Sequence, residues 1–154
     1  METVLILDFG AQYSQLIARR VREQNVYCEV KPCSISPAEI EKIAPIGIIL
    51  SGGPQSVYES VSPHVDPALF ALGIPVLGIC YGCQLMAYSL GGTVAAATEA
   101  TAREYGKTLT EFDTHSAIFQ DLPASSVTWM SHGDYISRVP VSYTHLTLPT
   151  NSLV

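Results

Sequence analysis

The sequence predicts an α/β protein with a mostly parallel β-sheet and helices on both of its faces. Three observations support this prediction. Apolar runs of strand length alternate with helical patterns over residues 4–90. Apolar residues make up 47% of the 154 residues and charged residues only 14%, which suits strands that are buried on both sides. The length is typical of one domain, and no linker or internal repeat divides the chain.

The first two strands are predicted on either side of an amphipathic helix. The run VLILDF (4–9) has the length of a strand, and VYCEV (26–30) alternates like a second one. Between them, from Gln12 onward, apolar residues recur at helical spacing: Tyr13, Leu16, Ile17 and Val21. This order indicates a strand–helix–strand unit with a right-handed crossover.

The second helix has a clear start signal. In the sequence SPAE, Ser36 is placed to cap the helix, Pro37 stands at its first position, and Glu39 can close a capping box. We expect this helix to reach Ile43 and to lead into a third strand, GIIL (47–50).

The predicted sheet is completed by one more strand and helix. Residues 67–72 are expected to form one or two helical turns that stop at Gly73. PVLGI (75–79) is the fourth strand, and YGCQLMAYSL (81–90) is a helix that ends at a Gly-Gly pair. The signals after residue 92 are shorter and more β-like.

Gly78 and Gly82 flank Cys80 at the spacing of a nucleophile elbow, with cysteine in place of serine. The sharp strand-to-helix turn of an elbow leaves no room for side chains at these two flanking positions. It also places the thiol at a helix N-terminus, where the helix dipole lowers the thiol pKa. The spacing therefore selects Cys80 as the candidate nucleophile, and Cys83 is interpreted as a small apolar filler.

Other interpretations of the cysteines stay open. Cys80 and Cys83 form a C-x-x-C sequence at a helix start, as in thioredoxin-like redox proteins, although this leaves Gly78 unexplained. A cysteine after a strand is also often an inert buried residue. Zinc binding at Cys28 and Cys33 is disfavoured because no nearby histidine completes a tetrahedral set, and we expect no metal.

A thiolate that performs acyl transfer needs hydrogen-bond donors for an oxyanion. The backbone N–H of Tyr81, directly after the candidate nucleophile, would supply one of them. The loop SGGP (51–54) would supply another, because it follows the third strand and its glycines allow a close backbone approach. Ligands of parallel sheets bind at the carboxyl ends of the strands, so we expect this loop and Cys80 at one edge.

Composition and charge argue against several classes of protein. The net charge is −6 and no basic stripe is present, so nucleic acid is not an expected partner. No apolar stretch reaches the roughly 18–20 residues that span a bilayer, and the opening METVLILDFG lacks the basic start of a secretory signal. We therefore expect a cytoplasmic protein with reduced cysteines and no membrane partner.

Three motifs together resemble class I glutamine amidotransferases: GICYGCQ (78–84), SGGP (51–54) and MSHGD (130–134). The opening LDFGAQYSQLIARRVRE (7–23), together with Tyr81, resembles the N-terminal glutaminase domain of GMP synthetases, whereas related amidotransferases typically carry Leu after the nucleophile. The resemblance covers roughly residues 3–140 and implies a flavodoxin-like α/β fold.

The resemblance also implies roles for individual residues. Cys80 would attack the side-chain amide of glutamine and release ammonia, leaving a γ-glutamyl thioester. Gly53 and Tyr81 match oxyanion positions and Gln84 matches a contact to the substrate amide. The loop that holds the amino-acid end of glutamine is matched by Ser131, Gly133 and Asp134, and Glu104 is a further candidate for the pocket, whereas His132 is interpreted as a structural loop residue.

The implied partner is an ATP pyrophosphatase (synthetase) domain, in the same chain or in a separate subunit. That domain would use the ammonia, with ATP and magnesium, to convert XMP to GMP in purine biosynthesis. No cofactor is expected in the amidotransferase domain itself. The full-length enzyme is expected to be a homodimer.

The sequence departs from the family in its last part. The family carries a histidine and an acid in a stretch like QFHPE, and none of the four histidines, which are His64, His115, His132 and His145, stands in such a motif. We expect an incomplete amidotransferase domain over residues 1–140 and an unrelated tail over 141–154. Such a chain would be a very poor glutaminase, and its sheet would have an exposed edge.

Two other functions stay open. The chain could be the glutaminase domain of another amidotransferase, or an elbow-cysteine hydrolase that acts on a different amide. It could also be a catalytically dead domain that binds glutamine or a partner.

Overall fold

The computed structural model describes residues 2–97 and 104–140. The side chains of residues 104, 105 and 131 are outside the description, and so is the tail that we expect to be unrelated. Contacts between residues divide the chain into two compact units, Met1–Ser89 and Leu90–Val154. The sequence contained no linker that would have indicated this division.

The first unit is built on a four-stranded parallel sheet in the order β2-β1-β3-β4. Its strands are β1 (Thr3–Asp8), β2 (Tyr27–Pro32), β3 (Gly47–Leu50) and β4 (Val76–Gly78). The prediction of a parallel sheet is therefore confirmed. Among the described residues, β2 and β4 are the edge strands of this sheet.

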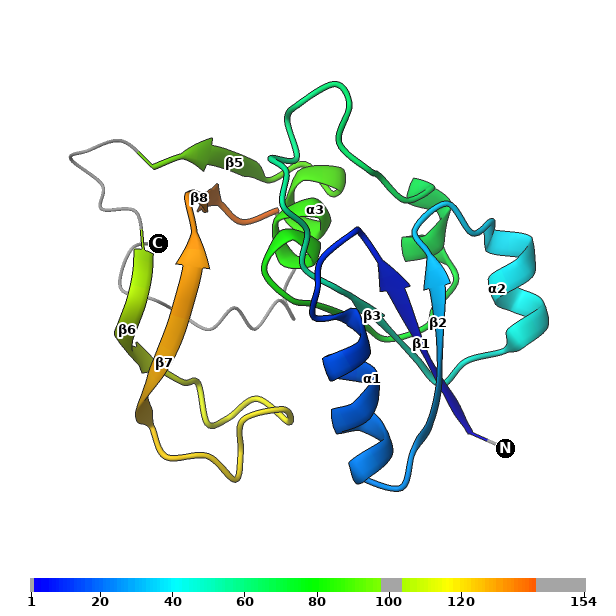
Figure 1. Ribbon diagram of the computed structural model, residues 1–154, viewed down its shortest axis with the longest axis horizontal. Helices are drawn as coiled ribbons and strands as arrows, with labels where there is room; N and C mark the ends of the chain where they lie inside the picture. The colour runs from blue at the N-terminus through cyan, green and yellow to red at the C-terminus, as the bar shows by residue number, and fades with distance from the viewer. Residues whose placement is uncertain (1, 98–103, 141–154) are drawn as a thin grey trace. The chain divides into compact units, whose positions relative to one another are not determined.

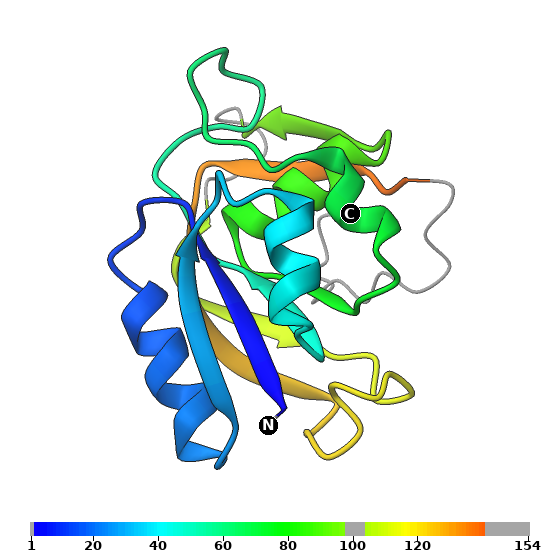
Figure 2. The same ribbon diagram turned by 90° about the vertical axis from the view of Figure 1, so that its right-hand side faces the viewer.

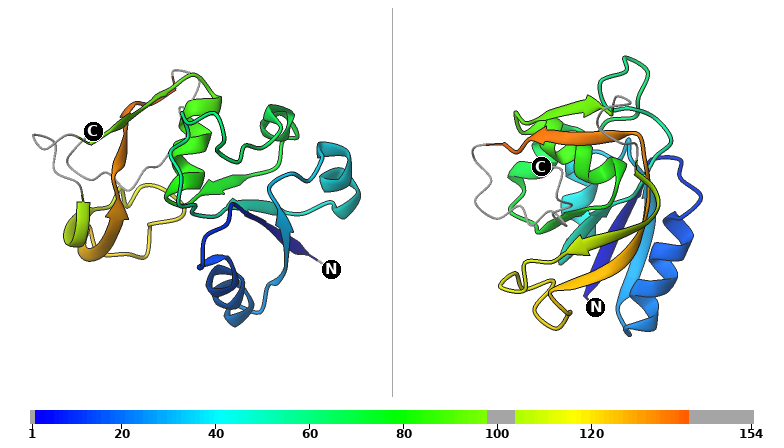
Figure 3. Two further views of the ribbon diagram at one scale, coloured as in Figure 1. Left: turned by 45° about the horizontal axis from the view of Figure 1, so that its top comes forward. Right: turned by 90° about the vertical axis from the view of Figure 1, so that its left-hand side faces the viewer.

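Two helices follow β1 and β2: α1 (Ser14–Glu23) and α2 (Pro37–Ile43). The chain moves from β1 to β2 in one direction and from β2 across β1 to β3 in the other. Right-handed crossovers then place α1 and α2 on opposite faces of the sheet, which is the arrangement that Figure 3 shows. The sequence prediction of helices on both faces is confirmed.

The apolar face of α1 packs on the first two strands. Ala18 of α1 is fully buried with Ile6 of β1 and Cys28 of β2. Arg19 and Arg20, on the exposed side, form ion pairs with Glu23. Ile17 and Val21 also pack against this cluster, whereas Tyr13 and Leu16, which belong to the same apolar pattern, are exposed.

The start of α2 is the capping box that the sequence indicates. The Ser36 hydroxyl accepts a hydrogen bond from the Glu39 backbone N–H, and the Glu39 carboxylate accepts one from the Ser36 N–H. Pro37 occupies the first turn. The helix ends at Ala44, which has a φ of 48°.

After β3, a long loop leads to the short 3₁₀ helix η1 (Pro67–Ala71), to β4 and then to α3 (Tyr81–Ser89). Only Ile79 and Cys80 separate the end of β4 from the start of α3, so the strand turns sharply into the helix that Figure 1 labels α3. The apolar residues Leu85, Met86 and Ala87 are buried along α3. This junction carries the candidate nucleophile.

The second unit consists of two antiparallel strand pairs. Strand β5 (Thr93–Ala96) pairs with β8 (Asp134–Arg138), and β6 (Glu104–Glu111) pairs with β7 (Ser125–His132). Figure 2 shows β6 and β7 running side by side. Within the described ranges these strands pair with one another and not with the parallel sheet, which is why they form a separate unit.

Two negative results apply to the described part of the chain. None of its helices is long and apolar enough to cross a membrane. None of its clusters of His, Cys, Asp and Glu side chains could hold a metal ion.

Candidate active site

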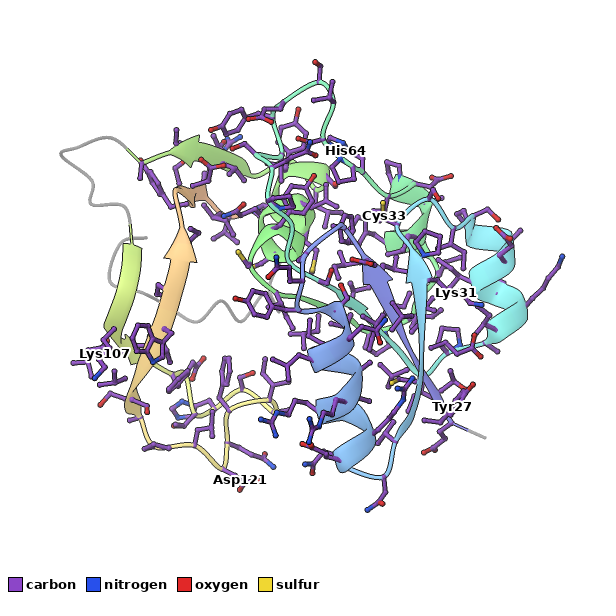
Figure 4. The ribbon with its side chains drawn as sticks, viewed as in Figure 1. Tyr27, Lys31, Cys33, His64, Lys107 and Asp121 are labelled. Carbon is purple, nitrogen blue, oxygen red and sulfur yellow. The ribbon has the colours of Figure 1, made fainter. Side chains whose placement is uncertain are left out.

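The candidate site lies at the carboxyl ends of the parallel strands. Figure 4 labels Tyr27 at the start of β2 and Cys33 just beyond its end, and these two residues mark the two ends of the sheet. The segments after β1, β3 and β4 begin with Phe9, Ser51 and Ile79 respectively. The sheet topology therefore brings SGGP and Cys80 to one edge, as expected.

Cys80 has the strained backbone of a nucleophile elbow. Its φ is 52°, in the left-handed region that non-glycine residues rarely adopt. The turn is closed by the Gly82 N–H, which donates to the carbonyls of Ile79 and Ser51 at 3.0 and 3.1 Å. The Cys80 carbonyl accepts from the N–H groups of Cys83 and Gln84, so the residue begins the first turn of α3.

The two flanking glycines are sterically required. A Cβ atom at Gly78 would lie 2.6 Å from the backbone N and Cα of Cys83. One at Gly82 would lie 2.3 Å from the carbonyl oxygen of Leu50. Both distances are far below van der Waals contact with backbone atoms that cannot turn away, so the structure supports the reason given for the G-x-C-x-G spacing.

The environments of Cys80 and Cys83 differ sharply. Cys80 is exposed, whereas Cys83 lies in the first turn of α3, where burial raises the pKa of its thiol to about 12. A second, smaller cause of this pKa rise is the neighbouring Cys80. A thiol with such a pKa is almost entirely protonated at neutral pH, which weakens the redox interpretation of the C-x-x-C sequence.

The SGGP loop approaches the elbow closely. A Cβ atom at Gly52 would lie 3.7 Å from the Cβ of Cys80. Gly53 is tighter: a Cβ there would be 3.2 Å from the Phe9 carbonyl oxygen and 3.2 Å from Cγ of Tyr81. The structure thus brings together Gly53, Cys80 and Tyr81, the three residues to which the chemistry at the reacting carbonyl was assigned.

A polar network that the sequence did not reveal holds this loop in place. The hydroxyl of Ser51, fully buried, accepts from the Phe9 N–H at 3.3 Å and lies 3.3 Å from the Ser14 hydroxyl. The Ser14 hydroxyl donates to the Asp8 carboxylate at 2.7 Å, and that carboxylate also accepts from the Gly10 N–H. The network joins the ends of β1 and β3 to the start of α1. The acid at the end of β1, six residues before a serine, was the sequence signal that could have indicated it.

The other predicted residues fall in both units. Gln84 is buried in the first turns of α3, four residues after Cys80. Ser131, Gly133 and Asp134 belong to the second unit, at the junction of β7 and β8. There the Gly133 carbonyl accepts from the Ala97 N–H at 2.7 Å. Their roles toward glutamine stay predictions, as does that of Glu104.

The described histidines have different surroundings. His115 is exposed and forms an ion pair with Asp113 at 3.1 Å. His64 places Nδ1 2.7 Å from the Ser62 carbonyl oxygen and its ring 6.1 Å from that of Tyr88. His132 ends β7, opposite residue 104 of β6. His145 lies outside the described residues.

Solved structures provide the first comparison. A Thermoplasma acidophilum protein, described as a candidate subunit of GMP synthase, aligns with a TM-score of 0.77 and 29% identity over 92% of this chain and 69% of that one. A Thermotoga maritima glutamine amidotransferase aligns with a TM-score of 0.67 and 22% identity over 90% of this chain and 63% of that one, and supports the fold alone.

Sequence relatives and a family model provide the second comparison. The glutamine-hydrolysing GMP synthases of Natranaerobius thermophilus and of Clostridium botulinum strain Hall are 52% and 56% identical over 142 residues. These alignments cover 92% of this chain but only 27% of each relative.

The family model described as glutamine amidotransferase class-I matches residues 5–151 of the chain. The match includes part of the segment 141–154 that was expected to be unrelated, so the boundary after Pro140 stays a prediction. This match extends over almost the whole chain and includes both the elbow and the SGGP loop. The chain therefore belongs to the class I glutamine amidotransferase family.

Proposed function

We propose that the chain is the glutaminase part of a GMP synthase. In this role Cys80 hydrolyses glutamine, and the ammonia serves the conversion of XMP to GMP in a separate synthetase part. The main observation in support of this proposal is that Cys80 is exposed and has a φ of 52°, while the glycine backbone of residues 52–53 packs against the same turn. The identity of 52–56% to glutamine-hydrolysing GMP synthases supports this choice within the family.

The chemistry has two stages. The Cys80 thiolate adds to the side-chain amide carbon of glutamine, and the carbonyl oxygen becomes an oxyanion that the N–H groups of Gly53 and Tyr81 would stabilise. The carbon–nitrogen bond then breaks, the nitrogen takes up a proton and ammonia leaves, which produces a γ-glutamyl thioester. Water cleaves the thioester, giving glutamate and restoring the thiol.

The remaining parts of the proposal concern the whole enzyme. The chain spans 27% of the length of its curated relatives. We propose that the synthetase reaction takes place in the rest of such an enzyme. ATP and magnesium would act there and not at Cys80. We also propose a cytoplasmic location and a homodimeric full-length enzyme, as the family resemblance implies.

The first experiment tests the nucleophile and its substrate class. The 154-residue chain is incubated with a glutamine analogue whose amide NH₂ is replaced by a chloromethyl group, and the adduct is mapped by mass spectrometry. We expect one adduct at Cys80, slowed by excess glutamine and absent in Cys80→Ser. Labelling that glutamine does not slow, or an adduct at Cys83, would contradict the proposal.

The second experiment tests the link to GMP. Residues 1–140 of this chain replace the matching residues of the Clostridium botulinum relative, and GMP formation from XMP is measured with glutamine or with ammonium as nitrogen source. Ammonium-dependent synthesis reports on the synthetase part alone and is the internal control. We expect glutamine-dependent synthesis that Cys80→Ser abolishes while ammonium-dependent synthesis persists. Failure with glutamine in a chimaera that is active with ammonium would overturn the assignment.

A further inference from the structure

The side chain of Tyr81 joins three segments at the carboxyl end of the sheet. Its ring lies against that of Phe9, which follows β1, with centroids 5.4 Å apart. The base of the ring lies against Gly53, where an added Cβ would be 3.2 Å from Tyr81 Cγ. At the other end of the ring, the hydroxyl donates to the carbonyl oxygen of Pro63 at 2.5 Å. The side chain is only 1% exposed, so these contacts exclude water.

Gly53 and Pro63 belong to the same loop, the segment 51–66 between β3 and η1. The loop has internal bonds of its own, from the N–H groups of Glu59 and Ser62 to the carbonyls of Ser56 and Glu59. Its beginning is fixed to the elbow, because the Ser51 carbonyl accepts from Gly82. The rigid Tyr81 ring therefore spans the loop, with Gly53 at its base and Pro63 at its tip.

The position of the hydrogen-bond acceptor is informative. A buried tyrosine hydroxyl needs a partner, and any buried carbonyl would satisfy it. Here the partner lies ten residues beyond the expected oxyanion donor, in the same loop. Burial raises the pKa of the Tyr81 hydroxyl, so the group stays protonated and continues to donate at neutral pH.

We propose that the Tyr81 side chain is a positioning residue for the oxyanion hole, holding the backbone N–H of Gly53 toward the reacting carbonyl by spanning the loop between Gly53 and Pro63. Tyr81 then acts twice: its N–H is a donor and its side chain supports the other donor. This inference rests on the proposed glutaminase function.

The test uses the 154-residue chain, the variant Tyr81→Phe and two electrophiles. The chloromethyl ketone analogue of glutamine reacts through a hemithioketal whose oxygen occupies the oxyanion hole. Iodoacetamide alkylates the thiol by direct displacement and forms no oxyanion. We expect Tyr81→Phe to slow the labelling of Cys80 by the ketone by roughly tenfold, which is a smaller effect than removal of an oxyanion donor would have. The rate of labelling by iodoacetamide should change by less than about twofold. Tyr27→Phe, at the opposite end of the sheet in Figure 4, is the matched control and should change neither rate.

Hydrogen exchange of the loop gives a readout that does not depend on glutamine. Removing the hydroxyl should speed amide exchange in the part of the loop around Pro63 and leave α1 unchanged. If the ketone proves no more selective for Cys80 than iodoacetamide in the unchanged chain, the proposed function fails, and the exchange data alone decide whether Tyr81 supports the loop.

Two outcomes would overturn the inference. One is a Tyr81→Phe variant with the original ketone rate and the original loop exchange. The other is an equal loss of rate with both electrophiles, because that would mean that the elbow itself has moved.

Discussion

Gly82 lies so close to Leu50 that a Cβ atom on the glycine would be 2.3 Å from the leucine carbonyl oxygen and 2.6 Å from its Cβ. The two residues belong to the start of α3 and the end of β3, so this contact sets how closely the nucleophile-bearing helix approaches the neighbouring strand. The Leu50 carbonyl also accepts from the Ile79 N–H at 3.0 Å. Any residue larger than glycine must therefore displace the elbow from the sheet.

The first prediction concerns this contact. Gly82→Ala should destabilise the chain by at least about 2 kcal/mol, because overpacking against backbone atoms cannot be relieved by a rotamer change. Gly47→Ala is the matched control, since a Cβ there meets only the Pro75 carbonyl oxygen at 3.8 Å. Urea unfolding of the two variants measures the difference. Equal midpoints for Gly82→Ala and the unchanged chain would show that the elbow is looser than described.

The second prediction concerns pH. Burial raises the pKa of Cys83 from its usual 9.0 to about 12 in the folded chain. Below the unfolded value both states hold the proton, and this contribution to stability is fully present. Above it the unfolded chain loses the proton first, so stability falls as the pH rises from about 9 toward 12. Unfolding free energies measured under reducing conditions between pH 8 and pH 10.5 should therefore decrease.

The variant Cys83→Ala separates the contribution of Cys83 to the pH dependence of stability from that of other groups that titrate at high pH. Its stability should fall less steeply above about pH 9 than that of the unchanged chain, since the remaining thiols and tyrosines contribute to both curves. Parallel curves for the two proteins would contradict a strongly raised pKa at Cys83.

The third prediction concerns the polar network beneath the SGGP loop. Ser51→Ala would leave the Phe9 N–H without its buried acceptor, which should cost about 1–3 kcal/mol. It should also slow labelling of Cys80 by the glutamine analogue, because the next two residues of the loop lie against the elbow. Ser34→Ala, outside this network, is a suitable control. Unchanged labelling together with lowered stability would limit Ser51 to a structural role.

The sequence predicted the four parallel strands, the helices and the elbow because each rests on local chemistry, whereas it did not locate β5 to β8 individually. The capping box of α2 needs only Ser36, Pro37 and Glu39, and the elbow needs only two glycines around Cys80. Apolar periodicity located α1 but only part of its buried face, because Ile17 and Val21 pack on the core whereas Tyr13 and Leu16 are exposed. These features are decided by residues that are close together in the sequence.

The features that sequence reasoning missed depend on residues that are far apart. The bond from Tyr81 to the Pro63 carbonyl spans 18 residues, and that from Phe9 to Ser51 spans 42. Backbone acceptors carry no mark in the sequence, and hydroxyl groups have too many alternative partners for one to be chosen in advance. The left-handed end of α2 at Ala44 was also missed, because alanine does not signal a positive φ.

The last prediction concerns turnover. Expulsion of ammonia requires a proton and cleavage of the thioester requires a base, and the family resemblance implies a histidine motif for both that these 154 residues do not contain. We therefore expect the 154 residues to form the covalent adduct at Cys80 but to release ammonia from glutamine slower by several orders of magnitude than a protein that includes such a motif.

The comparison protein carries residues 1–140 followed by the corresponding continuation of the Clostridium botulinum relative, and both are assayed for steady ammonia release. The lengthened protein should turn over continuously, whereas the 154-residue chain should label at Cys80 without turnover, because the elbow and the oxyanion donors suffice for addition but not for proton transfer. Equal steady rates would mean that a histidine of this chain already acts as the base. Replacing each of the four histidines, which are His64, His115, His132 and His145, by Asn in turn would then identify it, since only the loss of the true base would stop ammonia release while leaving the adduct at Cys80 intact.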